Sequence, residues 1–207
     1  MNVDAAHPYR RAGAVIAASA FVWEVGVSPA PRVYTTADAA ERLAILQRAR
    51  RAWVAGQFLT AAGTAAVPAG FAGFAGALPP GVSKKLTTTA AAALLAGAPL
   101  FIAAVADRAS DVERFAYRRG PGWPFLGYCG LHLVALSSLG AALLKMPAKR
   151  WIGAGVLLSA PIFASILVAK KDIPPFVFYL VEQAAGVYLC FYREPEQEVA
   201  TKTRRRH

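Results

Sequence analysis

Seven residues with side chains suited to proton transfer or to binding a polar ligand lie inside stretches of the chain that are otherwise apolar. They are Glu24, Gln57, Tyr128, His132, Tyr179, Glu182 and Gln183. Tyr128 stands one helical turn before His132, and Tyr179 is close to Glu182 on the same segment. A charged side chain at the centre of a bilayer costs at least about 2.5 kcal/mol. Each ionisable residue in such a segment therefore needs a partner or a function.

Motifs for enzymatic chemistry are absent from the sequence. Only His132 among the three histidines lies in an apolar stretch, so one chain cannot hold haem between two facing histidines. Cys129 and Cys190 form no CxxC pair and are interpreted as small buried side chains. The chain has neither GxSG nor HExxH, no run of aspartates, and too few ligands for a metal site. We therefore expect no catalytic residues, no metal and no cofactor.

The elements that must position these side chains are predicted from where charge is missing. Of the 207 residues, 56% are hydrophobic and 17% are charged, against about 25% charged in a soluble domain. A single helix of about twenty apolar residues satisfies its own backbone hydrogen bonds across a hydrocarbon core of about 30 Å. Six such spans are expected, at about 12–28, 52–78, 86–106, 123–144, 151–169 and 176–192.

The predicted fold is thus an all-α, multi-pass membrane protein with one transmembrane domain over residues 1–193 and a disordered basic tail over 194–207. The first apolar stretch also fits a secretory signal peptide, although Trp23 and Glu24 stand where a cleavage site should be small and neutral. Both interpretations place the rest of the chain in a membrane.

Two connections are long enough to have structure of their own. In residues 29–52, Asp38 and Glu41 predict the start of a helix over 39–51 that lies at the surface and runs straight into the second span. Residues 107–122 are expected to form a polar loop.

The net charge of +11 fits lipid headgroups better than nucleic acid, because Lys and Arg cluster at the ends of apolar windows. We expect contacts with anionic lipids near the basic loops and the tail. Six spans place both termini on one side, which collects twelve basic residues against eleven on the other. The basic pair before the first span and the short connections favour both termini in the cytoplasm of a cell.

The depth of the polar residues is the most informative pattern in the sequence. Consecutive spans run in opposite directions, so an odd span ends at the face where the next span begins. Glu24 is near the end of the first span, Gln57 near the start of the second, and His132 and Glu182 no deeper than the middle of theirs. All fall between the midplane and the face that carries the two long connections. They can share one polar pocket open to that face, or they can be separate helix contacts satisfied locally.

Small residues predict how the helices pack. Gly56, Gly63 and Gly70 recur every seven residues and so lie on one stripe of the second span. Such stripes allow close approach of backbones in a membrane. The stripe can serve packing within the chain or a homodimer.

The chain resembles the small, uncharacterised six-span integral membrane proteins of bacteria. The resemblance lies in the basic start before Ala12, the helix entering Trp53 and the segment 172–176 before the last span. It implies a six-span fold and brings no catalytic residues. In both halves of the chain, pairs of basic residues and pairs of prolines precede the spans. This pattern is typical of an inverted repeat, as in many carriers.

The sequence is compatible with two functions. One is a membrane-embedded binding, accessory or structural subunit, alone or in a larger membrane complex. The other is a small carrier or sensor for protons or a solute, using a pocket around Glu182 and His132.

Overall fold

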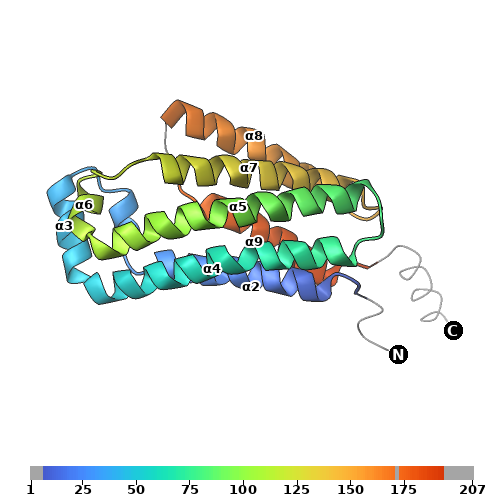
Figure 1. Cartoon of the computed structure of the whole chain (residues 1–207), viewed down its shortest axis with the longest axis horizontal. Coiled ribbons are helices and arrows are strands. Elements are labelled where there is room, and N and C mark those ends of the chain that lie inside the picture. Colours follow the sequence, from blue (N-terminus) through green and yellow to red (C-terminus); the bar gives the residue numbers. More distant parts are fainter. Residues whose placement is uncertain (1–6, 171–172, 194–207) are drawn as a thin grey trace.

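The computed structural model of the chain describes residues 7–170 and 173–193, and within these ranges every regular element is a helix. Six long helices run side by side along the longest axis of the molecule (Figure 1). They are α2 (Arg10–Val27), α4 (Arg50–Ala77), α5 (Val82–Ser110), α7 (Trp123–Leu144), α8 (Arg150–Lys170) and α9 (Phe176–Phe191). The expected all-α class is therefore confirmed. The tail predicted to be disordered lies outside the described residues.

Four of the described helices, α4, α5, α7 and α8, are long and apolar enough to cross a membrane. The helix α9 is apolar but has 16 residues, which at 1.5 Å per residue is about 24 Å. The helix α2 has 18 residues and carries Arg10, Arg11 and Glu24. The structure thus shows a bundle with four helices suited to spanning, in the segments expected for the second to fifth spans.

The helix α5 is longer than the expected span of 86–106 at both ends. It begins at Val82, before Lys84 and Lys85, and ends at Ser110, after Asp107. Charged residues at a helix end do not stop the helix, because their long side chains can reach the interface while the backbone stays helical. The charged residues therefore predict where the apolar window of α5 ends, but not where the helix itself ends.

The packing order of the helices differs from their order in the chain. Helix α2 packs between α4 and α9, α5 packs between α4 and α7, and α8 packs mainly on α7. The core between them is rich in aromatic side chains that are at most 2% exposed, including Trp23, Phe71, Phe101, Tyr128 and Tyr179. The helix α8 lies at the edge of this arrangement and exposes a row of large apolar side chains, namely Trp151, Leu158, Ile162 and Val168.

The glycine stripe of α4 faces α2. A Cβ atom added at Gly63 would lie 2.7 Å from the Ser19 carbonyl oxygen and 2.8 Å from the Trp23 Cβ, and one at Gly70 would lie 2.6 Å from Ile16. Gly56 meets Gly26 of α2 in the same way. The stripe is therefore filled within the chain, and a homodimer through it would have to displace α2.

Two further seams depend on glycine. Gly13 and Gly186 let α2 and α9 meet, and a Cβ at Gly186 would lie 2.8 Å from the Gly13 carbonyl oxygen. Gly153 of α8 lies against the backbone of α7, where a Cβ would be 2.8 Å from the Leu143 carbonyl carbon. Close backbone contacts of this kind are how helices associate where hydrocarbon removes the hydrophobic effect.

One end of the bundle carries additional structure, which we call the cap. It consists of η1 (Pro31–Tyr34), α3 (Ala39–Arg48) and α6 (Val112–Ala116). The Asp38 carboxylate caps α3 by accepting a 2.7 Å hydrogen bond from the Glu41 amide. The expected start of this helix is correct, but α3 ends at Arg48 instead of continuing straight into α4.

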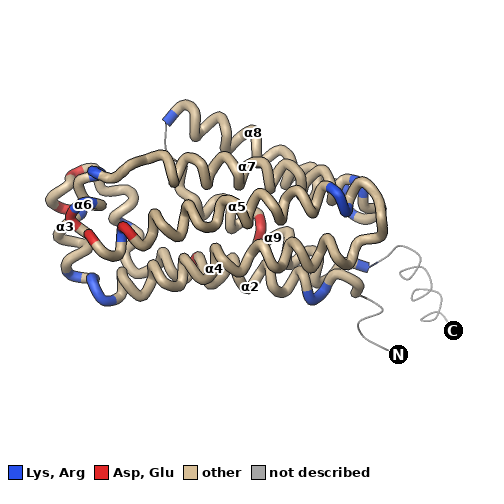
Figure 2. The backbone as a smooth tube through the Cα atoms, in the orientation of Figure 1, with Lys and Arg blue, Asp and Glu red and all other residues tan. Residues whose placement is uncertain are grey.

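The expectation of a plain polar loop over 107–122 is wrong. Part of it belongs to α5, and Asp111 caps the short helix α6 through a 2.8 Å bond from the Arg114 amide. The cap has its own small apolar core, built from Ala30, Val33, Leu46, Trp53 and Ala116. Charged residues gather at the cap and at the opposite end, leaving the bundle between them nearly free of charge (Figure 2).

Candidate functional site

Glu182 and His132 lie in contact at the middle of the bundle. The Glu182 Oε1 of α9 is 2.9 Å from the His132 Nε2 of α7, and the two side chains are 0% and 1% exposed. The distance is that of an ion pair, but the angles are not those of a hydrogen bond. The other polar atoms of the pair, Nδ1 and Oε2, are buried without a hydrogen-bond partner in the described part of the chain.

A chain of hydroxyl groups runs beside this pair. The Tyr128 hydroxyl donates to the Tyr179 hydroxyl at 2.8 Å, and the Tyr179 hydroxyl lies 2.8 Å from the Thr64 Oγ1. Thr64 gives its single proton to the Thr60 carbonyl oxygen at 2.9 Å, so Tyr179 must be the donor to Thr64. Each of these three hydroxyl groups thus donates its proton, and the series of hydrogen bonds ends on the Thr60 carbonyl oxygen of α4.

Aromatic rings enclose these polar atoms. Trp23 of α2 stacks on Tyr179 with ring centroids 4.2 Å apart, and Phe101 of α5 stacks on Tyr128 at 4.3 Å. Phe178 stacks on His132 at 4.7 Å. Trp23 has room to contact Tyr179 because Gly63, which lies against it on α4, has no side chain. The result is a layer of polar atoms held between apolar layers.

We call this cluster the polar centre and define it as Thr64, Tyr128, His132, Tyr179 and Glu182. Three helices contribute to it, namely α4, α7 and α9. Each member is at most 3% exposed. Four of the seven residues singled out from the sequence belong to it, and Thr64 was missed. The spacing of Gln57, Thr60 and Thr64, three and seven residues apart on α4, is a signal that could have found Thr64.

The other three singled-out residues lie elsewhere. Glu24 is half-buried on α2, and its Oε1 has no hydrogen-bond partner in the described residues. Gln183 is half-buried on α9. Gln57 is 2% exposed and belongs to the cap side of α4, beside Tyr34.

Tyr34 shows the electrostatics of this side of the cap. Although Tyr34 is 37% exposed as a residue, desolvation of its hydroxyl raises the pKa of that group above its ordinary value of 10.0, while the charge of Arg108 acts in the lowering direction. Arg108 itself lies over the rings of Phe101, Phe115 and Phe125, 5.2 to 5.7 Å from their centroids. The Arg108 guanidinium thus contacts one ring of the cap, that of Phe115 in α6, and two rings of the long helices, those of Phe101 and Phe125.

The polar centre is enclosed, because none of its side chains is more than 3% exposed. Two shallow hollows, of about 380 and 340 Å³, lie at opposite ends of the bundle, and no residue of the polar centre lines either of them. The described residues also contain no group of three or more His, Cys, Asp and Glu that could hold a metal ion. The arrangement can therefore hold helices together or hold a proton between His132 and Glu182.

Comparison with known proteins does not indicate a function for this chain. No protein-family model, no curated protein and no solved structure matches this chain.

Proposed function

We propose that this chain is a six-span membrane protein that acts as a membrane-embedded binding, accessory or structural subunit, with no substrate turnover. The observation that carries this proposal is the closed polar centre. Its hydroxyl protons are all used, its side chains are at most 3% exposed, and its hydrogen bonds end on a backbone carbonyl. Such a network fixes the relative positions of helices, which is what a structural subunit needs.

The packing of α2 and α9 supports six spans rather than four. Helix α2 packs against α4 on one side and α9 on the other, and it meets α9 through Gly13 and Gly186. Arg10 and Arg11 stand in the first turn of α2, where long side chains can reach headgroups. Both termini then lie on one side, proposed to be the cytoplasmic side of the cell membrane, and the cap lies on the other.

Cysteine labelling tests the number of spans. In a chain with Cys129 and Cys190 replaced by serine, single cysteines at the exposed positions Ala37 and Lys85 report the two faces, and an N-terminal tag reports the terminus. Six spans place the tag on the side of Lys85. Four spans, with α2 outside the membrane, place it on the side of Ala37. An impermeant maleimide applied to sealed cells separates the two outcomes.

A second candidate is a proton-linked carrier or sensor. It is favoured by the unpartnered His132 Nδ1 and Glu182 Oε2, because ionisable groups inside a membrane commonly mark proton or solute paths. The inverted-repeat pattern points the same way. In this case the pair has to become accessible in a second conformation.

The substitution Glu182→Gln in proteoliposomes decides between the two candidates. We expect the wild type and the variant to show the same proton flux under an imposed pH gradient, and the variant to unfold at a lower temperature. A variant that folds as stably as the wild type but loses a pH-dependent flux would contradict the structural proposal and establish the carrier. His132→Gln provides the matching change on the other partner.

A further inference from the structure

Arg42 is a buried cation in the cap. It is 7% exposed, and it donates from Nε to the Ala116 carbonyl at 2.7 Å and from Nη1 to the Thr36 and Ala37 carbonyls, both at 2.9 Å. No carboxylate in the described residues pairs with it. Its Nη2 donates none of these bonds and is not among the fully enclosed polar atoms, so it reaches solvent. A rigidly held guanidinium thus keeps one donor nitrogen free.

Beside this nitrogen lies the hollow of about 340 Å³ at the surface of the cap. Its lining residues are Tyr34, Thr35, Thr36, Ala37, Arg42 and Arg118. Arg118 is exposed and has a left-handed backbone, with φ of 52°. Two arginines therefore line one hollow, and no acidic residue does.

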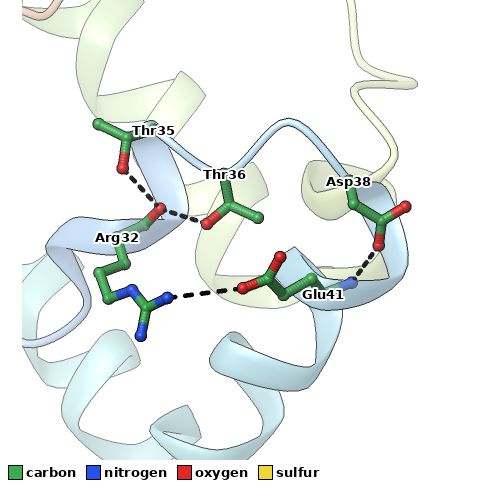
Figure 3. A network of polar contacts seen from close by, with 5 residues as sticks. All are labelled: Arg32, Thr35, Thr36, Asp38 and Glu41. Atoms are coloured by element: carbon green, nitrogen blue, oxygen red, sulfur yellow. Dashed lines mark hydrogen bonds and ion pairs between the residues drawn. The ribbon is translucent and has the colours of Figure 1, made fainter.

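The acidic residues nearest in sequence are engaged elsewhere. Figure 3 shows the Asp38 carboxylate on the Glu41 amide and the Glu41 carboxylate near Arg32, at 3.7 Å. The hydroxyls of Thr35 and Thr36 both donate to the Arg32 carbonyl. The charged donors left for a ligand in the hollow are thus the guanidinium groups of Arg42 and Arg118, beside the Tyr34 hydroxyl. Across 29–52 and 107–122, nine arginines face five carboxylates, a surplus of four positive charges.

We propose that this hollow binds a phosphate-bearing anion, either the headgroup of a lipid or free phosphate. A guanidinium forms short, charge-assisted hydrogen bonds with phosphate oxygens, and its planar donors suit that geometry. Three backbone carbonyls already hold Arg42 in place, so little entropy is lost on binding. The anion also supplies the negative charge that Arg42 lacks. The lipid source rests on the proposed membrane topology, whereas binding of free phosphate does not.

The test uses the full chain in two settings. In maltoside micelles, inorganic phosphate is titrated against chloride at matched ionic strength while thermal unfolding is followed. In nanodiscs, phosphatidylcholine alone is compared with an equal mixture of phosphatidylcholine and phosphatidylglycerol, and bound lipid is counted by native mass spectrometry. Stabilisation by phosphate assigns the free ion, and retained phosphatidylglycerol without a phosphate effect assigns the lipid.

Two matched variants make the test specific. Arg118→Asn removes one guanidinium from the hollow, and asparagine tolerates the left-handed backbone. Arg119→Asn removes the neighbouring charge, whose side chain lies over Tyr117 and does not line the hollow. We expect Arg118→Asn to weaken binding about tenfold, the loss of one charge-assisted hydrogen bond, and Arg119→Asn to leave it unchanged. Equal weakening by both variants, or no binding of either probe to the wild type, overturns the proposal.

Discussion

The polar centre and the cap each bury a charged side chain, and they stabilise it in opposite ways. In the cap, Arg42 is held by three backbone carbonyls, faces no carboxylate in the described residues, and keeps Nη2 in solvent. In the polar centre, Glu182 is 0% exposed, and its Oε1 lies 2.9 Å from the His132 Nε2. Carbonyl dipoles are sufficient where water reaches the charge. A fully enclosed carboxylate needs a counter-charge or a proton.

This difference predicts which site is more sensitive to the loss of a partner. At the polar centre, removing one group leaves the other in a dry interior with nothing to replace it. At the cap, water can enter and hydrate the carbonyls that lose their donor. The polar centre should therefore show strong coupling between its two residues, and the cap should show a smaller, more local effect.

The largest effect is expected for His132→Ala, which isolates Glu182. Breaking a buried pair by removing one partner typically costs about 3–5 kcal/mol. We expect a loss of free energy of unfolding in that range, measured by SDS titration in mixed micelles. Glu182→Ala should cost a similar amount, because His132 then loses the carboxylate that lies 2.9 Å from its Nε2.

The double variant His132→Leu/Glu182→Met tests the physical reason. Replacing both members of a buried pair by apolar residues of similar volume is often close to neutral. We expect it to be more stable than either single alanine variant. If the double variant is as unstable as the sum of the singles, the two residues stabilise the bundle independently and the ion pair has no special role.

A smaller effect is expected at the cap. Arg42→Ala leaves three carbonyls without a donor at the edge of solvent, and we expect a loss of about 2 kcal/mol. Proteolysis should then be faster within α3 and α6 than within the bundle. Arg48→Ala is the matched control, because Arg48 is exposed on the same helix. A loss at Arg42 as large as that at His132 would remove the distinction between the two regions.

The sequence could predict the polar centre better than the cap for a physical reason. Ionisable residues inside apolar windows are rare, so His132 and Glu182 stood out, and the alternation of span direction put them at similar depth. Arg42 lies among other charged residues, where one more arginine carries no signal. Its partners are backbone carbonyls, one of them 74 residues away, and no side-chain pattern reports a carbonyl.

The fold shows the same limit. Apolar windows located the helices, because hydrocarbon demands an unbroken apolar length. They did not locate the ends of α5 or reveal α6, because those depend on caps such as Asp111 and on how far charged side chains can reach. The aromatic layers around Tyr179 also depend on packing: Trp23 stacks there only because Gly63 leaves room across the seam.

The smallest effect is expected for a charge pair that is not buried. Arg114 Nη1 lies 3.2 Å from Asp107 Oδ1 in the cap, and the side chains are 43% and 44% exposed. Water screens such a pair, so Arg114→Ala should change the free energy of unfolding by about 0.5 kcal/mol or less. The same micelle titration measures it, with Arg119→Ala as a second exposed control. A loss near that of Arg42→Ala would mean that ion pairs, rather than carbonyl contacts, hold the cap together, and the contrast between cap and polar centre would then be one of degree.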